Sequence, residues 1–228
     1  MRKSILYILP FLCLLFSCKE QPKPKVKYDK PVTKIAIKQD TTRLEVADLP
    51  VQMGSVLVYP IGQLRVSDLR KGEFESEKTE GAVFNVSNVM DDELTGYMKN
   101  IKFQEIGKDS LHVLSDKELH IERMTYLKHK KIFVYVLADS DTNQDGKVDA
   151  DDVKSLYISS ELGKDFTKLS ADMQEVLDWN YIENTGKIFF RTLDDRNKNG
   201  AFDKQDGIHY FYVNLMKEWK AQEVSVVK

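Results

Sequence analysis

The fold is decided by a sequence pattern that occurs three times in the chain: "IKFQEIGKDSLHVLS" (101–115), "LYISSELGKDFTKLS" (156–170) and "FYVNLMKEWKAQEVS" (211–225). Each copy has an extended apolar run, a turn and a second short run that ends in serine. The three serines, Ser115, Ser170 and Ser225, are 55 residues apart. Short runs rich in aromatic and β-branched residues and bounded by Gly, Asp or Lys predict β-hairpins. Their fixed spacing predicts a repeated structural unit.

Two further runs lie between these hairpins and extend the repeat. They are "KIFVYVLAD" (131–139) and "KIFFRTLDD" (187–195), which begin 56 residues apart. Helical periodicity is hard to find anywhere, so the sequence predicts an all-β domain built from four-stranded antiparallel meanders. The predicted units span 55–115, 116–170 and 171–225. In the last two, the predicted strands are 120–127, 131–139, 154–160, 166–170, 176–183, 187–194, 208–214 and 219–225.

A four-stranded meander of this length has the size of a propeller blade. The phrases "KSLYISSELGKDFTKLS" and "TGKIFFRTLDD" resemble blades of TolB-like six-bladed propellers, and this resemblance covers about 100–228. Three units are too few to close a propeller. The resemblance therefore implies an open array of blade-like repeats or closure through a second chain. The alternative is a generic antiparallel β-sandwich.

Two acidic loops, "DTNQDGKVDADD" (141–152) and "DRNKNGAFDKQD" (195–206), fall between the second and third predicted strands of consecutive units. Calcium takes six to eight hard oxygen ligands, and a twelve-residue loop supplies them from positions 1, 3, 5, 7, 9 and 12. Gly146 and Gly200 occupy position 6, where the chain must turn sharply. The predicted ligands are Asp141, Asn143, Asp145, the carbonyl of Lys147, Asp149 and Asp152, and then Asp195, Asn197, Asn199, the carbonyl of Ala201, Asp203 and Asp206.

Both loops resemble the EF-hand loop, and aspartate at position 12 makes them most similar to its dockerin-type variant. Predicted strands flank them here in place of helices, which argues against the helix opening of a calcium sensor. The resemblance implies two calcium ions. The predicted ligands include four carboxylates in the first loop and three in the second, so we expect tighter binding in the first. The alternative is a pair of solvated, Asx-rich hairpin turns.

The beginning of the chain, "MRKSILYILPFLCLLFSCKE", has the layout of a secretory signal: Arg2 and Lys3, an apolar run and a small residue before the cut. The stretch "LFSC" resembles the lipobox of bacterial lipoproteins, which implies cleavage before Cys18 and lipidation of that cysteine. An ordinary signal peptide is the alternative. We therefore expect a signal peptide at 1–17, a Lys/Pro-rich tether at 18–34 that extends from a membrane, and a β-repeat domain at 35–228.

Composition limits the disulfides and the classes of partner that we expect for the mature domain. Cys13 and Cys18, the two cysteines of the chain, both lie in this leader, so no disulfide is expected in the mature domain. The chain has 34 basic and 36 acidic residues, and loss of Arg2 and Lys3 would leave 32 basic residues and a formal charge of −4. A nucleic-acid partner requires a basic surface, so the charge argues against one.

Three classes of function remain. The sequence has no nucleophile elbow, no phosphate-binding glycine loop and no His-Glu-x-x-His motif. We therefore expect a lipid-anchored, calcium-binding module that binds a protein or glycan in the cell envelope without catalysis. Lysine after Cys18 favours the outer membrane, by analogy with lipoprotein sorting. An envelope enzyme such as a glycan hydrolase, and a structural or assembly factor of the outer membrane, are the alternatives.

Overall fold

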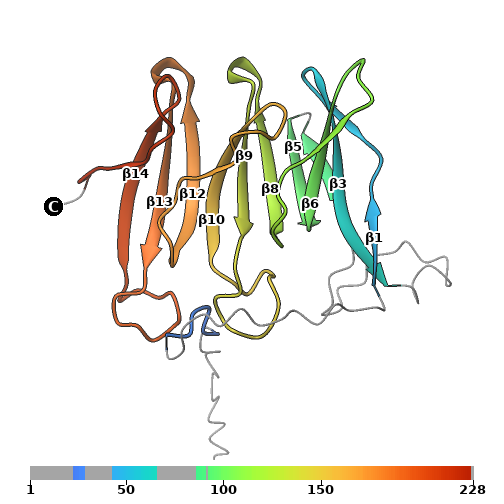
Figure 1. Ribbon diagram of the computed structural model, residues 1–228. Coiled ribbons are helices and arrows are strands. Elements are labelled where there is room, and N and C mark those ends of the chain that lie inside the picture. The colour runs from blue at the N-terminus through green and yellow to red at the C-terminus, as the bar shows by residue number, and fades with distance from the viewer. Residues whose placement is uncertain (1–22, 29–42, 66–85, 91, 227–228) are drawn as a thin grey trace, which may run out of the picture.

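The computed structural model describes residues 23–28, 43–65, 86–90 and 92–226. Within these ranges the chain forms β-strands and two short 3₁₀ helices, and no α-helix. The strands make three sheets in which neighbouring strands are antiparallel (Figure 1). This arrangement confirms the predicted all-β fold class. We name the sheets N-terminal, central and C-terminal by the order in which the chain enters them.

The central and C-terminal sheets contain the last two predicted units. The central sheet has the order β11-β10-β9-β8-β5-β4, and the C-terminal sheet has the order β12-β13-β14-β15. The central strands are β4 (Val86–Met90), β5 (Glu93–Met98), β8 (His120–Leu127), β9 (Ile132–Ala138), β10 (Lys154–Ser160) and β11 (Thr167–Lys168). The C-terminal strands are β12 (Gln174–Ile182), β13 (Lys187–Asp194), β14 (Gly207–Asn214) and β15 (Gln222–Glu223). In both units a 3₁₀ helix, η1 (Lys128–Lys130) or η2 (Glu183–Thr185), joins the first two strands.

The N-terminal sheet differs from the expected first unit. It has the order β1-β3-β6-β7, with β2 paired to β3. Its strands are β1 (Arg43–Ala47), β2 (Val51–Met53), β3 (Val56–Arg65), β6 (Asn100–Glu105) and β7 (Leu111–Val113). Segment 55–115 is thus divided, because β4 and β5 join the central sheet. Leu94 of β5 pairs with Met124 of β8. Strand β5 therefore adds residues from the expected first unit to the sheet of the second unit, 116–170.

Two hydrophobic cores lie on opposite faces of the central sheet. Successive residues of a strand point to opposite faces, and β9 uses both: Phe133 and Tyr135 enter the core shared with the N-terminal sheet, while Ile132 and Val134 enter the core shared with the C-terminal sheet. Six of the seven residues of β9 are buried. The central sheet is therefore the middle layer of the domain.

The last two units meet through equivalent faces. Ile132 and Ile188 occupy the same place in the repeat, and both belong to the core between the central and C-terminal sheets. The equivalent residues Ile158 and Val213 also lie in that core. Successive blades of a propeller would instead present opposite faces to each other. The contact between these units is therefore that of a sandwich, the alternative arrangement expected from the sequence.

Candidate metal-binding loops and the N-terminal strap

The two acidic loops lie at the same end of the domain (Figure 1). The first follows β9 and precedes β10, and the second follows β13 and precedes β14, as the repeat predicted. We call this end, with residues 23–28, the loop end. Because β9 and β13 are long and paired on both sides, they hold the start of each loop in a defined place.

The first loop is organised by hydrogen bonds from its own backbone. Asp141 accepts from the N–H of Asp145 through Oδ1 at 3.0 Å and from that of Gly146 through Oδ2 at 2.9 Å. The same Asp145 N–H also donates to Oδ1 of Asn143 at 2.9 Å. Oδ1 of Asp145 accepts from the N–H of Lys147 at 3.0 Å. The side-chain oxygens of Asp141 and Asn143, at positions 1 and 3, therefore point toward the same N–H group in the turn.

The second loop repeats this pattern position for position. Asp195 accepts from the N–H groups of Asn199 and Gly200 at 3.2 and 2.8 Å, and Oδ1 of Asn197 accepts from Asn199 at 2.9 Å. Oδ1 of Asn199 accepts from the N–H of Ala201 at 2.8 Å.

The backbone conformations of the two loops also correspond. Position 4 has a positive φ in both loops, 58° at Gln144 and 55° at Lys198, and position 6 has φ of 91° at Gly146 and 83° at Gly200. Left-handed conformations of non-glycine residues are uncommon. Their recurrence at position 4 shows that the two loops share one backbone path.

The carboxylate at position 12 closes each loop. Oδ1 of Asp152 accepts from the N–H groups of Thr142 and Asn143 at 2.7 and 3.2 Å, and Oδ2 accepts from that of Asp149 at 2.9 Å. In the second loop, Asp206 accepts from the N–H groups of Arg196 and Asp203 at 3.2 and 2.7 Å. Asp152 is fully buried, and this burial raises the pKa of its carboxyl group even though the N–H donors act in the opposite direction.

The remaining predicted ligands are partly free. Asp149 and Asp203, at position 9, each accept one backbone N–H through Oδ1, from Asp151 at 3.0 Å and from Gln205 at 2.7 Å. Within the described part of the chain, no three His, Cys, Asp or Glu side chains gather closely enough to form a metal site by themselves. A cation in either loop therefore requires the asparagine oxygens and backbone carbonyls as well.

Residues 23–28, which we call the strap, lie against both loops (Figure 1). The N–H groups of Lys25 and Val26 donate to the carbonyl of Gly200 at 2.6 and 3.0 Å. The N–H of Lys27 donates to the carbonyl of Thr142 at 3.1 Å. The strap thus makes main-chain hydrogen bonds with the second loop and then with the first.

Side chains also hold the strap in place. Val26 is buried, with 2% of its surface exposed. Nζ of Lys25 forms an ion pair with Glu175 at 2.7 Å, and the hydroxyl of Tyr28 donates to Oδ2 of Asp195. The expected tether at 18–34 is therefore not free of the domain over 23–28. Cys18, the predicted lipidation site, lies outside the described residues.

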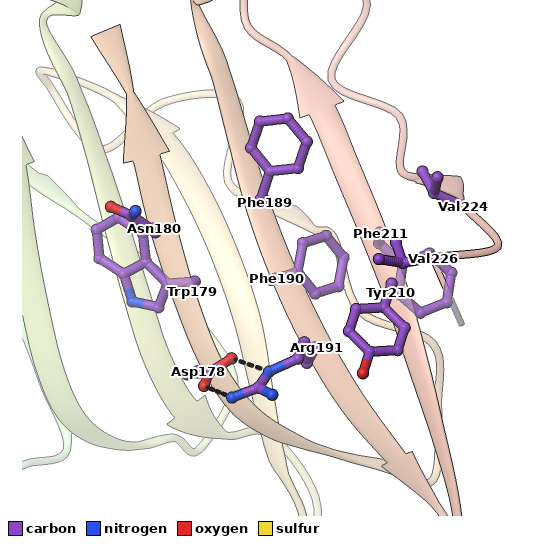
Figure 2. A pocket seen from close by; sticks show the side chains of 10 residues that line it. All are labelled: Asp178, Trp179, Asn180, Phe189, Phe190, Arg191, Tyr210, Phe211, Val224 and Val226. Carbon is purple, nitrogen blue, oxygen red and sulfur yellow. Dashed lines mark hydrogen bonds and ion pairs between the residues drawn. The ribbon is translucent and has the colours of Figure 1, made fainter.

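A separate open pocket of about 370 Å³ lies on the C-terminal sheet (Figure 2). Its lining includes Trp179, Phe189 and Tyr210, and Asp178 is the one carboxylate among its ten lining residues. The guanidinium of Arg191 contacts both oxygens of Asp178 and lowers the pKa of this carboxyl group. Glycan hydrolysis uses two carboxyl groups, one of them as an acid. This pocket does not supply such a pair.

Comparisons with known proteins add no family. No protein-family model matches the chain, and no curated protein sequence matches it. Across the ranges that the structure covers, no helix has the length and apolar character needed to cross a membrane.

Proposed function

We propose that this protein is a calcium-binding β-repeat lipoprotein, anchored by its lipid in the cell envelope at the outer membrane. In this proposal it binds a protein or glycan without catalysing a reaction. The observation that carries the proposal is the matched geometry of the two loops. A turn that only needs to be hydrophilic places few demands on its carboxylates. These loops keep the same acceptors, the same donors and the same left-handed positions.

We propose fewer ligands than the twelve expected from the sequence. In the first loop we assign Asp141, Asn143, Asp145, the carbonyl of Lys147 and Asp149 to the ion. In the second we assign Asp195, Asn197, Asn199, the carbonyl of Ala201 and Asp203. We assign Asp152 and Asp206 to loop closure, because each accepts N–H groups from both the start and the end of its loop. The backbone donors to Asp141 and Asp195 lie at positions 5 and 6.

The chemistry of the loops fits calcium, which prefers carboxylate, amide and carbonyl oxygens. Bound calcium would neutralise the carboxylates of each loop and would stabilise the folded state. A ligand that binds the folded form alone adds about 1.4 kcal/mol at ten times its dissociation constant. Two such sites would add roughly 3 kcal/mol, a large fraction of the stability of an ordinary domain.

For partner binding, the pocket on the C-terminal sheet is the surface we favour. It combines half-buried aromatic rings with the Asp178–Arg191 pair, so it offers an apolar surface beside oriented polar groups (Figure 2). Aromatic and arginine side chains are enriched where proteins bind partners.

Thermal unfolding tests the calcium assignment. The protein is unfolded in chelator, in millimolar calcium and in millimolar magnesium. We expect calcium to raise the melting temperature and magnesium to do less, since magnesium demands a tighter octahedral geometry. Asp141→Ala should remove more of the gain than Asp195→Ala, because the first loop has more carboxylates. Coincident melting curves in chelator and calcium would show that the loops are only acidic turns.

A further inference from the structure

The docked strap fixes which end of the domain is nearest to Cys18. The strap begins at Lys23, five residues after Cys18. An extended chain spans at most about 3.3–3.6 Å per residue, so this connection reaches roughly 17 Å at most. The eight residues of β13, which separate the second loop from η2, extend over roughly 26 Å. The turns η1 and η2 lie at the opposite end of their strands and are therefore much farther from Cys18 than the loops are.

We propose that the loop end is the membrane-facing surface of the domain and that it lies against anionic phospholipid headgroups. This inference rests on the proposed anchoring at Cys18. The anchor, the short connection and the docked strap together leave the loop end as the surface within reach of the bilayer.

The charge of the loop end fits this partner. The whole chain is slightly acidic, with a formal charge of −2. In the second loop, however, all exposed charged side chains are basic, because its three aspartates are buried or half-buried. Asp145 and Asp151 are the exposed acidic residues of the first loop. The exposed basic residues of the strap and the two loops are Lys23, Lys27, Lys147, Arg196, Lys198 and Lys204. Clusters of lysine and arginine near a membrane anchor attract the anionic leaflet.

The strap is what maintains this orientation. If it detached, the first described element after Cys18 would be β1, about 25 residues along the chain. A flexible linker of that length has a root-mean-square span of roughly 25–30 Å and imposes no preferred orientation. When docked, the strap holds the loops close to the anchor through Gly200 and Thr142.

Hydrogen exchange on vesicles tests the proposal. The protein purified from cell membranes is reconstituted into vesicles of phosphatidylcholine with phosphatidylglycerol, or of phosphatidylcholine alone, in the presence of chelator. Protein that carries no lipid is coupled through the thiol of Cys18 to a maleimide lipid, so that both preparations are anchored at the same residue. We expect exchange in 23–28 and 195–206 to slow several-fold on the anionic vesicles only. Exchange at η1 and η2 should not change.

Two glycine variants give a matched control. A Cβ at Gly200 would lie 2.2 Å from the carbonyl oxygen of Val26, whereas a Cβ at Gly146 would meet nothing within 4 Å. Both glycines have positive φ, so both substitutions strain the loop backbone similarly. Gly200→Ala should therefore release the strap and abolish the selective slowing, while Gly146→Ala should keep it. Replacing Lys198 and Lys204 with glutamine should reduce the slowing.

Equal slowing at both ends, slowing at η1 and η2 alone, or identical results on neutral and anionic vesicles would overturn the proposal. These outcomes are separate from the failure of the proposed function. If the protein proves to lack a lipid in cells, the anchoring at Cys18 is wrong there, yet the chemically coupled protein still shows whether the loop end faces anionic headgroups.

Discussion

The hydroxyl of Tyr28 donates a hydrogen bond of 2.9 Å to Oδ2 of Asp195, the carboxylate oxygen that also accepts the N–H of Gly200. Tyr28 belongs to the strap, and Asp195 is the first residue of the second loop. The strap therefore contacts a proposed calcium ligand directly. Any ligand that orders Asp195 should also favour the docked strap, and by thermodynamic linkage the docked strap should favour that ligand by the same factor.

Proteolysis of the strap checks this coupling. Calcium should slow cleavage after Lys25 and Lys27 by endoproteinase Lys-C, an enzyme that does not itself need calcium. Gly200→Ala should weaken calcium binding, measured by titration calorimetry. The expected factor equals the factor by which calcium slows cleavage of the unsubstituted protein. Gly146→Ala, which strains a loop without touching the strap, should leave the calcium dependence of cleavage at 25 and 27 intact. Cleavage at the same rate with and without calcium would refute the coupling.

The separate roles of positions 9 and 12 can be tested without the ion. Asp152→Ala should lower the free energy of unfolding by about 2–4 kcal/mol in chelator, because it leaves buried N–H groups without an acceptor. Asp149→Ala should cost about 1 kcal/mol or less under the same conditions. The stabilisation that calcium adds should show the opposite order. Asp149→Ala should lose more of this added stabilisation than Asp152→Ala does. Urea unfolding in both buffers measures all four values.

His120 should make the fold sensitive to mild acid. It is buried, its Nε2 has no hydrogen-bond partner, and burial lowers its pKa to about 4, with Lys99 acting in the same direction. The unfolded chain binds this proton near pH 6.5, so the contribution of His120 to stability is lost as the pH falls from about 6.5 to 4. The loss amounts to about 3 kcal/mol. His120→Phe should flatten this part of the pH profile of urea unfolding.

His129→Phe is the matched control for that profile, because the His129 side chain is exposed. It should leave the pH dependence unchanged. If the two variants gave the same profile as the unmodified protein, the acid sensitivity would arise elsewhere.

Anchoring is tested by Cys18→Ala. The substitution should release the protein from membranes or leave an uncut precursor, because it removes the sulfur atom that we propose carries the lipid. Membrane fractionation and the mass of the mature chain report the outcome. An unchanged mass together with full membrane association would contradict the lipoprotein proposal.

The strands of the repeats could be predicted from sequence because each carries its own local signal. "KSLYISS", for example, coincides with β10, and the loops fall where the repeat placed them. Strand β5 was missed, since "ELTGYM" has Thr95 and Gly96 at its centre and lacks regular alternation. Its conformation comes from pairing with β8, which no local pattern records. The same limit explains why segment 55–115 was expected to form one sheet.

The strap was missed for a related reason. Residues 23–28 are rich in lysine and proline, and Val26 is their one aliphatic residue. Their docking depends on Gly200, whose missing Cβ leaves room for the Val26 carbonyl. Position 12 shows a different limit, since an aspartate that binds an ion and one that accepts backbone N–H groups are the same letter. The hydrogen bonds around Asp152 are the reason we propose the second role for it.

The contact of the last two units through equivalent faces bears on how such a chain can arise. A surface that pairs with its own equivalent is self-complementary, so a single ancestral unit could already have formed a symmetric dimer. Duplication and fusion would then convert an existing interface into the core around Ile132 and Ile188, with no need to invent a new one. The sequences could diverge afterwards, because each face needed to match only one fixed neighbour.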